Sequence, residues 1–163
     1  MDKAYEITIR NGRRIIKGLG NFEPVPVYDL RELVKGSVKK YGGKTAFKFK
    51  RNGALVEKSY KDFDQAVDAL GLKESKIAII SENRYEWAVA YFSIINGTGT
   101  GVPLDKYLPQ NEVENLIRRS GASAIFYSAS YQEMMEAVSK KGTTLKYFIC
   151  MDELPQALTD ERF

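Results

Sequence analysis

The sequence predicts an α/β protein with a parallel, doubly wound sheet built from βαβ units and preceded by a helix and a β-hairpin. Short apolar segments at 76–81, 101–104, 124–127 and 146–151 alternate with helical patterns. Strands that alternate with helices of about 10–15 residues are typical of βαβ units joined by right-handed crossovers. The first segment, KIAIIS, has the continuous apolar character of a strand that is buried on both faces of a parallel sheet.

The N-terminal part reads as an irregular lead-in with short strands over 1–27, followed by a helix over 30–41. Asp29 is placed to cap this helix, and Glu32 three residues later is placed to bond back to Asp29. Gly42 and the glycine after it end the helix. The residues expected on its inner face are Leu30, Leu33, Val34, Val38 and Tyr41.

A β-hairpin is predicted next, with strands at 46–50 and 54–59. The two strands flank Arg51, Asn52 and Gly53, and an Asn-Gly pair is a strong hairpin signal because both residues tolerate positive φ. A helix is expected after the hairpin, over 60–70, ended by Gly71. Its expected buried stripe comprises Phe63, Ala66, Val67 and Leu70.

Three helices are expected between the four predicted parallel strands, at 84–96, 109–120 and 130–141. Proline in the first turn suits the second of them, because the first N–H groups of a helix have no partner within it. We therefore divide the chain into a lead-in with a first helix, 1–43, and a hairpin with an α/β subdomain, 44–163.

Composition indicates a folded domain and excludes several chemistries. A chain of 163 residues that is 44% hydrophobic and 28% charged is long and apolar enough to bury a core. It has no histidine, so serine–histidine triads and histidine metal sites are impossible within it. Its single cysteine, Cys150, cannot form an internal disulfide, which favours a reducing, cytoplasmic location.

The charge pattern gives no sign of a nucleic-acid site or a membrane span. The net charge is +4, and basic residues occur only in short pairs such as Arg118 and Arg119 near the ends of predicted helices. The N-terminal residues are charged, unlike a signal peptide. The longest apolar stretch, 87–95, is far shorter than the ~20 residues that span a bilayer.

Polar residues come after the predicted strands, at the edge where α/β sheets place ligands. Glu82 and Asn83 follow the first strand, Asp105 and Lys106 follow the second, and 128–130 follows the third. A receiver-type acidic pocket needs paired acids after the first strand, and Glu82 alone matches it poorly. We therefore expect helix caps and polar loop tips here, and assign no catalytic, cofactor-binding or metal-binding residue.

Three further features have structural interpretations. The glycine-rich run 97–101 comes after a helix and leads into a strand, so it lacks the strand-to-helix order of a phosphate-binding loop and predicts tight helix–strand packing. Cys150 lies within an apolar strand and is expected to be a buried structural thiol. Trp87, Tyr91 and Phe92 have helical spacing, and we expect Trp87 to be a core anchor whose ring packs onto the sheet.

Several motifs resemble the adenylate-forming superfamily. The stretch KIAIISENRYEWAVAYF at 76–92 has the family's buried strand, then Asn, two residues, Glu-Trp and a helix. GTGVPLD at 99–105 is similar to the family's next segment, and SGA at 120–122 leads into the next strand. KTAF at 44–47 and SYKDF at 59–63 match upstream. The resemblance covers 28–150, and bacterial fatty acyl-CoA synthetases are the most similar branch.

The resemblance implies a two-step ligase. A fatty acid carboxylate attacks the α-phosphate of ATP with Mg²⁺ present, and the thiol of coenzyme A then displaces AMP from the acyl-adenylate. The family's phosphate loop, its adenine and ribose motifs and its C-terminal lysine have no counterpart within the 163 residues. The chain is therefore expected to be an inactive N-terminal fragment that binds none of these cofactors alone. Its expected partners are the rest of its large domain and a C-terminal domain.

Two points stay open from the sequence. Related sequences run about two more helical turns, ~7 residues, near Leu70 and Gly71, so either this chain has a deletion there or residues are missing from it. Two alternatives to the ligase fragment are a stand-alone α/β binding module and a receiver- or flavodoxin-like signalling domain. We also expect an exposed apolar surface that supports self-association through a sheet edge or the face around Trp87.

Overall fold

A parallel four-stranded sheet forms the centre of the computed structural model, which describes residues 5–18, 26–70, 76–97 and 99–153. The strand order is β6-β5-β7-β8, and every neighbouring pair is parallel. The chain thus moves outward in opposite directions after β5 and after β7, so these two adjacent strands form the switch point of a doubly wound sheet. The fold class predicted from the sequence is confirmed. The strands are β5 (Lys76–Ile80), β6 (Thr100–Pro103), β7 (Ala124–Tyr127) and β8 (Tyr147–Cys150).

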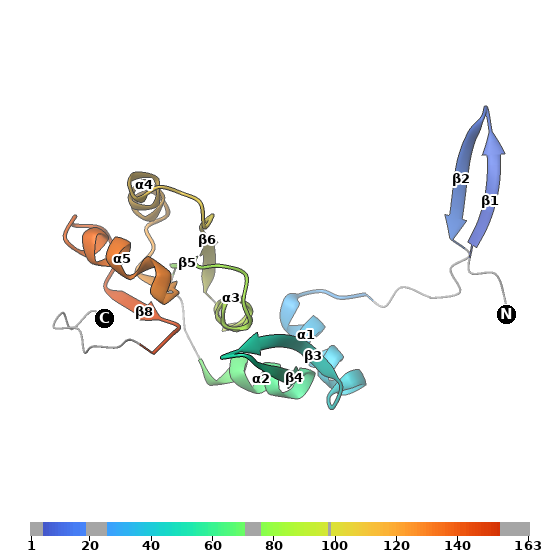
Figure 1. Cartoon of the computed structure of the whole chain (residues 1–163), viewed down its shortest axis with the longest axis horizontal. Helices are drawn as coiled ribbons and strands as arrows, with labels where there is room; N and C mark the ends of the chain where they lie inside the picture. Colours follow the sequence, from blue (N-terminus) through green and yellow to red (C-terminus); the bar gives the residue numbers. More distant parts are fainter. Residues whose placement is uncertain (1–4, 19–25, 71–75, 98, 154–163) are drawn as a thin grey trace.

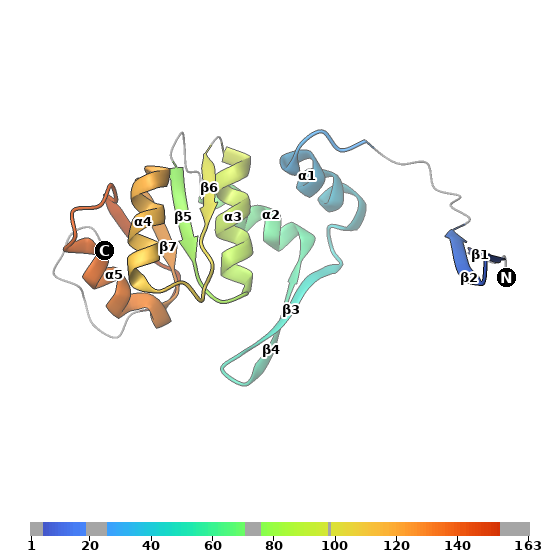
Figure 2. The ribbon, with the colours of Figure 1, turned by 90° about the horizontal axis from the view of Figure 1, so that it is seen from above.

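Helices cover both faces of this sheet (Figure 2). Ile77 and Ile79 of β5 pack towards α3 (Tyr85–Gly97), and Ala78 and Ile80 pack towards the opposite helices. Because alternate residues of a strand point to opposite faces, all four side chains are buried, as the continuous apolar pattern predicts. The opposite layer consists of α4 (Gln110–Ser120), a 3₁₀ turn (Ala129–Tyr131) and α5 (Gln132–Ser139).

A β-hairpin and two helices pack beside α3. The hairpin joins β3 (Thr45–Arg51) to β4 (Ala54–Ser59) through Asn52 and Gly53, which have φ of 50° and 79° as the Asn-Gly signal predicts. Ser59 and Asp62 form a capping box at the start of α2 (Tyr60–Ala69). The question of a deletion after Leu70 concerns residues 71–75, which lie outside the described residues.

The first helix, α1 (Leu30–Tyr41), is capped at its N-terminus by Asp29 as predicted, but two details of the prediction are wrong. Glu32 accepts a hydrogen bond from the backbone N–H of Tyr28, at 3.0 Å, instead of bonding back to Asp29. Leu30 and Leu33 are 41% and 42% exposed, and Val34 is the buried residue of the helix. The helix contacts α2 and α3 along one narrow stripe around Val34. Within the described residues, no element covers the wider apolar face to which Leu30 and Leu33 belong.

The lead-in forms a second antiparallel hairpin, β1 (Tyr5–Arg10) and β2 (Arg13–Gly18). Asn11 and Gly12 make its turn with φ of 49° and 72°. Figure 1 shows this hairpin set apart from the sheet and its helices, and every residue of its two strands is exposed. Among the described helices, none is both long enough and apolar enough to cross a membrane.

Gly101 shows why the glycine-rich run 97–101 occurs between α3 and β6. A Cβ atom at Gly101 would lie 3.2 Å from Cε2 of Tyr91 and 3.6 Å from Cγ2 of Ile95. The prediction of tight helix–strand packing is confirmed at this residue, because β6 lies so close to α3 that a Cβ atom there would press on the Tyr91 ring. The backbone N–H of Gly99 closes the end of α3 by donating to the Ile94 carbonyl.

We expect Gly101→Ala to lower the free energy of unfolding by about 1–2 kcal/mol, because Tyr91 must shift to admit the methyl group. Gly36→Ala is the matched control: nothing lies within 4 Å of its Cβ position in α1, so it should stabilise the chain by about 0.5–1 kcal/mol through helix propensity. Urea unfolding followed by circular dichroism measures both. A Gly101→Ala chain as stable as the unmodified chain would refute the close-packing explanation.

Candidate functional site

The segments after β5, β7 and β8 meet at the carboxyl edge of the sheet. Glu82, after β5, accepts hydrogen bonds from the hydroxyl of Ser128 at 2.6 Å and from that of Ser130 at 3.4 Å. Asp152, after β8, accepts one from the backbone N–H of Ala129 at 2.9 Å. The edge that sequence reasoning singled out is thus a connected polar network in the structure.

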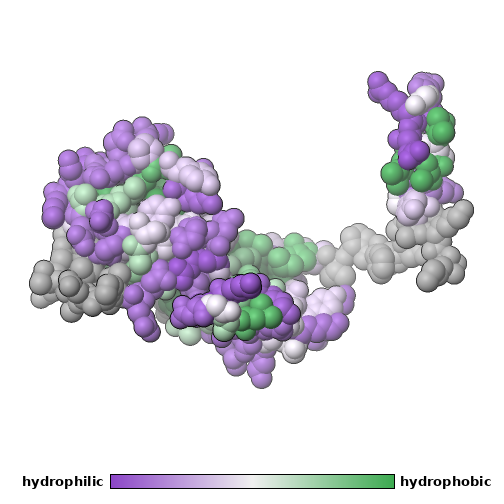
Figure 3. Space-filling view, in the orientation of Figure 1, coloured by the Kyte–Doolittle hydropathy of each residue, from purple (hydrophilic) through white to green (hydrophobic). Residues whose placement is uncertain are grey.

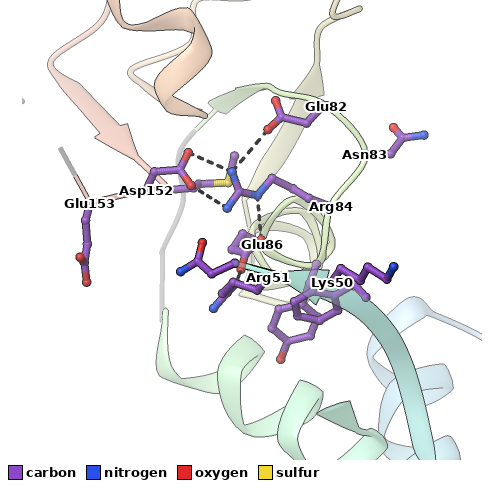
Figure 4. A pocket seen from close by; sticks show the side chains of 12 residues that line it. Lys50, Arg51, Glu82, Asn83, Arg84, Glu86, Asp152 and Glu153 are labelled. Atoms are coloured by element: carbon purple, nitrogen blue, oxygen red, sulfur yellow. Dashed lines mark hydrogen bonds and ion pairs between the residues drawn. The ribbon is translucent and has the colours of Figure 1, made fainter. Parts of the chain in front are cut away.

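Arg84 lies at the centre of this network (Figure 4). Its two terminal nitrogens bind both carboxylate oxygens of Asp152, at 2.9 and 2.7 Å, which is the bidentate geometry of strong arginine–carboxylate pairs. Its Nε donates to Glu86 at 2.7 Å, and a terminal nitrogen lies 3.5 Å from Glu82. Glu86 also pairs with Arg51 at the end of β3. One guanidinium therefore joins the sheet edge to α3 and, through Glu86, to the β3–β4 hairpin.

This network borders a hollow of about 870 Å³ between the β3–β4 turn and the sheet edge. Three of its lining residues are basic and four are acidic, and Arg84 and Arg51 are both taken up in ion pairs. The hollow therefore presents a nearly balanced surface, whose two arginines are paired, and no concentrated charge for a ligand. Its lining residues are Phe49, Lys50, Arg51, Asn52, Glu82, Asn83, Arg84, Tyr85, Glu86, Met151, Asp152 and Glu153.

The protonation states at this edge do not suit acid–base catalysis. The hydrogen bond and charge of Arg84 lower the pKa of Asp152. Burial acts to raise the pKa of Glu82, but the hydrogen bonds from Ser128 and the backbone and the charge of Arg84 lower it overall. Both groups are therefore ionised, weak bases at neutral pH, whereas a general base works best with a pKa near the operating pH.

Metal binding at this edge does not fit either. Among the described residues, no group of three or more aspartate, glutamate or cysteine side chains is arranged to hold a metal ion. The carboxylates of Glu82, Glu86 and Asp152 converge on the guanidinium of Arg84, so a cation already occupies the point they share. No step of a Mg²⁺-dependent reaction is assigned to these residues.

The structure separates the other polar residues that the sequence placed at strand ends. Asp105 accepts from the backbone N–H of Tyr107 at 2.8 Å and so caps its own loop, and the ammonium of Lys106 lies over the Tyr107 ring. The side chain of Asn83 points away from Arg84 in Figure 4. These residues fit the expected helix caps and polar loop tips. Arg84 and Asp152 were not identified from the sequence, although each comes shortly after a strand of the sheet.

Cys150 and Trp87 are both less buried than expected. Cys150 is only partly buried, and burial raises the pKa of its thiol, so the thiol is protonated and unreactive as a structural residue would be. Trp87 packs against the buried cluster formed by α3 and the sheet, as predicted, but it is not a fully buried anchor. Its ring is partly buried and stacks on Tyr91, with centroids 5.1 Å apart and planes at 14°. Tyr91 occupies the position between Trp87 and Gly101 of β6.

The lowered pKa of Asp152 predicts an acid-sensitive fold. A carboxyl group whose pKa is lower in the folded chain stabilises the fold above its unfolded pKa of about 4 and loses that contribution as the pH falls through its folded pKa. We expect the free energy of unfolding to be steady from pH 7 to pH 5 and to fall below about pH 4.

Asp152→Asn tests this assignment. It should destabilise the chain by about 1–3 kcal/mol at pH 7, and the gap to the unmodified chain should narrow as the pH falls below the ordinary aspartate pKa of about 4 and through the lowered folded pKa of Asp152. Glu133→Gln, at an exposed position of α5, is the control and should leave the pH profile unchanged. Denaturant midpoints measured from pH 7 down to acid pH test this, and a gap that does not narrow in acid would contradict the role of the Asp152 charge.

The doubly wound sheet with its flanking hairpin defines the class of fold: it is that of the N-terminal domain of adenylate-forming enzymes. The structure superposes on the anthranilate CoA ligase solved with anthranoyl-AMP at a TM-score of 0.69 and 17% identity, over 81% of this chain and 26% of that one. It also superposes on a fatty acyl CoA synthetase of Mycobacterium tuberculosis at 0.65 and 17%, over 75% and 26%.

The chain belongs to the AMP-binding enzyme family, whose model matches residues 34–162. It is 33% identical over 97 residues to fatty acyl-CoA synthetase A of Dictyostelium discoideum, and these 97 residues cover 59% of this chain and 14% of that protein. It is 24% identical over 134 residues to a crotonobetaine/carnitine–CoA ligase of Shigella flexneri, covering 77% of this chain and 26% of the ligase. The chain thus spans a minor part of the length of these relatives.

Proposed function

We propose that this chain is the N-terminal part of an ATP-dependent acyl-CoA synthetase that acts on fatty acids. The observation that carries the proposal is the family match over 34–162, together with relatives that are fatty acyl-CoA and carnitine–CoA ligases. In the proposed reaction a carboxylate oxygen attacks the α-phosphorus of ATP and pyrophosphate leaves. The sulfur of coenzyme A then attacks the acyl carbon, a thioester forms and AMP leaves.

The proposed role of residues 1–163 in this reaction is structural. The polar groups at the carboxyl edge are ionised and paired with one another, and burial raises the pKa of Tyr131 and of the Cys150 thiol. These groups support no nucleophile, and the network around Arg84 offers no free donor array for a triphosphate. We propose that ATP, Mg²⁺ and coenzyme A are held by the rest of the large domain and by a C-terminal domain, and that the single cysteine reflects a cytoplasmic location.

Fatty-acid-dependent exchange between pyrophosphate and ATP tests the proposal. Residues 1–163 alone should give no exchange above a blank, because developing charge on the transferred phosphorus has no stabiliser in this chain. The polypeptide from the complete reading frame of the source gene should give exchange with long-chain fatty acids, and thioester on adding coenzyme A. Exchange by the isolated chain would overturn its inactivity; no exchange by the complete polypeptide with any carboxylate would overturn the ligase assignment and favour a stand-alone binding module.

We further propose that the isolated chain self-associates where the rest of the enzyme would cover it. Within the described part of the chain, the outer edges of β6 and β8 are the unpaired edges of the four-stranded sheet, and Tyr91 of α3, on which Trp87 stacks, lies beside Gly101 of β6. Unpaired strand edges are templates for pairing with another chain. Sedimentation velocity over a range of concentrations measures this, and a strict monomer at high concentration would contradict it.

A further inference from the structure

The β1–β2 hairpin has one mainly apolar face. Ile7 lies opposite Ile16 in the register, and residues that face each other across an antiparallel pair project from the same side. Tyr5 and Ile9 alternate with Ile7 along β1 and therefore lie on that side too. These four residues, Tyr5, Ile7, Ile9 and Ile16, form what we call the apolar face of the hairpin. Arg14 lies opposite Ile9 and shares this side, whereas Ile15 lies on the other side with Arg10, Arg13 and Lys17.

This apolar face is open in the described structure. The exposed fractions of Tyr5, Ile7, Ile9 and Ile16 are 54%, 50%, 74% and 64%, and Figure 3 shows hydrophobic side chains of the hairpin at the surface. An isolated two-stranded hairpin is marginally stable in water, and a contiguous exposed apolar patch marks an interaction surface. The hairpin precedes the region matched by the family model, which begins at residue 34, so the fold of that region does not account for it.

The charge of the hairpin indicates the kind of partner. Arg10, Arg13, Arg14 and Lys17 stand against a single acid, Glu6, within β1 and β2. A second copy of this hairpin would bring the same excess of positive charge against itself. An apolar face that includes Arg14, on a hairpin with this excess of cations, instead complements a surface that has both an apolar interior and negative charge, which is the surface of a bilayer that contains anionic phospholipids.

We propose that the β1–β2 hairpin is a membrane-surface anchor that docks on anionic phospholipid bilayers. The apolar face enters the boundary between headgroups and acyl chains, where Tyr5 suits the interfacial environment. Arg14, on the same side, contacts lipid phosphates, and the cations on the other side of the hairpin add long-range attraction to the anionic surface. The outer edges of both strands keep unpaired backbone groups, so the hairpin stays at the depth of water and headgroups and does not enter the hydrocarbon core. The proposal is independent of the acyl-CoA synthetase activity.

Co-sedimentation of the full chain with vesicles tests the proposal. Binding should be strong to vesicles that mix phosphatidylglycerol with phosphatidylcholine, weak to phosphatidylcholine alone, and reduced by added salt. Arg13→Glu with Lys17→Glu should lower the partition coefficient for the mixed vesicles at least about tenfold. Lys140→Glu with Lys141→Glu makes the same change in net charge at exposed positions of the α/β body, and should lower it by less than about twofold.

The apolar contribution has its own pair of variants. Ile9→Ser with Ile16→Ser should also abolish most binding, whereas Leu55→Ser, at an apolar residue of β4 that is 57% exposed, should not. Because the serine variant can unfold the hairpin, Ile9→Trp provides a second readout. Its indole should show a blue-shifted emission and quenching by brominated lipids when mixed vesicles are added. The signal is measured as the difference from the unmodified chain, in which Trp87 is the single tryptophan.

Each outcome supports or overturns the anchor. Loss of binding in the hairpin variants, retained binding in the controls and a lipid-dependent shift of the Ile9→Trp emission support it. Absence of binding to the mixed vesicles overturns it, as does equal loss in the Lys140 and Lys141 control. Hairpin variants that change the sedimentation coefficient of the free chain but not its vesicle binding would also overturn it, because the surface would then be a protein interface.

Discussion

Phe63→Ala is expected to lower the free energy of unfolding by about 3–5 kcal/mol, against a total of roughly 5–15 kcal/mol for a domain of this kind. Phe63 on α2 is 6% exposed. Its ring lies 5.0 Å from that of Phe47 on β3 and 5.4 Å from that of Phe92 on α3, measured between centroids. The side chain thus joins the hairpin to the helix that covers the sheet, and its removal leaves a cavity between them.

Urea unfolding followed by circular dichroism measures this loss. Phe63→Leu keeps most of the apolar volume and should cost less than about 1.5 kcal/mol, so it provides a folded comparison if the alanine variant does not fold. Leu55→Ala, at the exposed residue of β4, is the surface control and should change stability by less than about 0.5 kcal/mol. A Phe63→Ala loss below about 1 kcal/mol would show that the hairpin and α2 are not held through this cluster.

The parts of the fold that carry a local signal were predicted from the sequence. The strand at β5 was predicted because a strand covered on both faces has no polar alternation, and the four residues from Ile77 to Ile80 are buried on alternating sides. The hairpin turn at Asn52 and Gly53 was predicted because positive φ restricts the choice of residue. In each case the physical requirement acts within a few residues along the chain.

The errors concern what lies opposite a residue, which periodicity does not determine. The apolar spacing of α1 predicts that Leu30 and Leu33 face inward, but only a narrow stripe around Val34 meets α2 and α3. Trp87 has helical spacing with Tyr91 and packs against the cluster between α3 and the sheet, but its ring is only partly buried and stacks on Tyr91. The spacing of apolar residues predicts which side of a helix faces inward. It does not predict how much of that side a neighbouring element covers.

The network around Arg84 was missed for a related reason. Arg84 and Asp152 are 68 residues apart in the chain, and they meet because β5 and β8 end at the same edge with β7 between them. The strand order β6-β5-β7-β8 was not predicted, and without it no local pattern pairs these two charges. Glu82 and Ser128 were noticed because they follow strands, and Arg84 and Asp152 do so as well. A search of every charged residue within a few positions after each strand would have found them.

Arg84→Met is expected to destabilise the fold by about 3 kcal/mol, in the range for removal of one partner from a desolvated ion pair. The Arg84 side chain is 20% exposed and that of Asp152 is 28% exposed, so water compensates the abandoned carboxylates only in part. Methionine keeps much of the length of the side chain, and the loss therefore measures the charge and its hydrogen bonds. Denaturant unfolding at pH 7 gives the value.

The matched variants distinguish this network from an ordinary surface ion pair. Arg118→Met removes a pair with Glu114 whose atoms are 4.0 Å apart and whose arginine is 52% exposed; it should cost less than about 0.5 kcal/mol. Arg84→Lys keeps the charge but cannot bind Asp152 with two parallel N–H groups, so its loss should fall between the other two. In a double-mutant cycle, Arg84→Met and Asp152→Asn should couple by at least about 1 kcal/mol. Additive losses would show that the Arg84 guanidinium and the Asp152 carboxylate do not stabilise each other across the sheet edge.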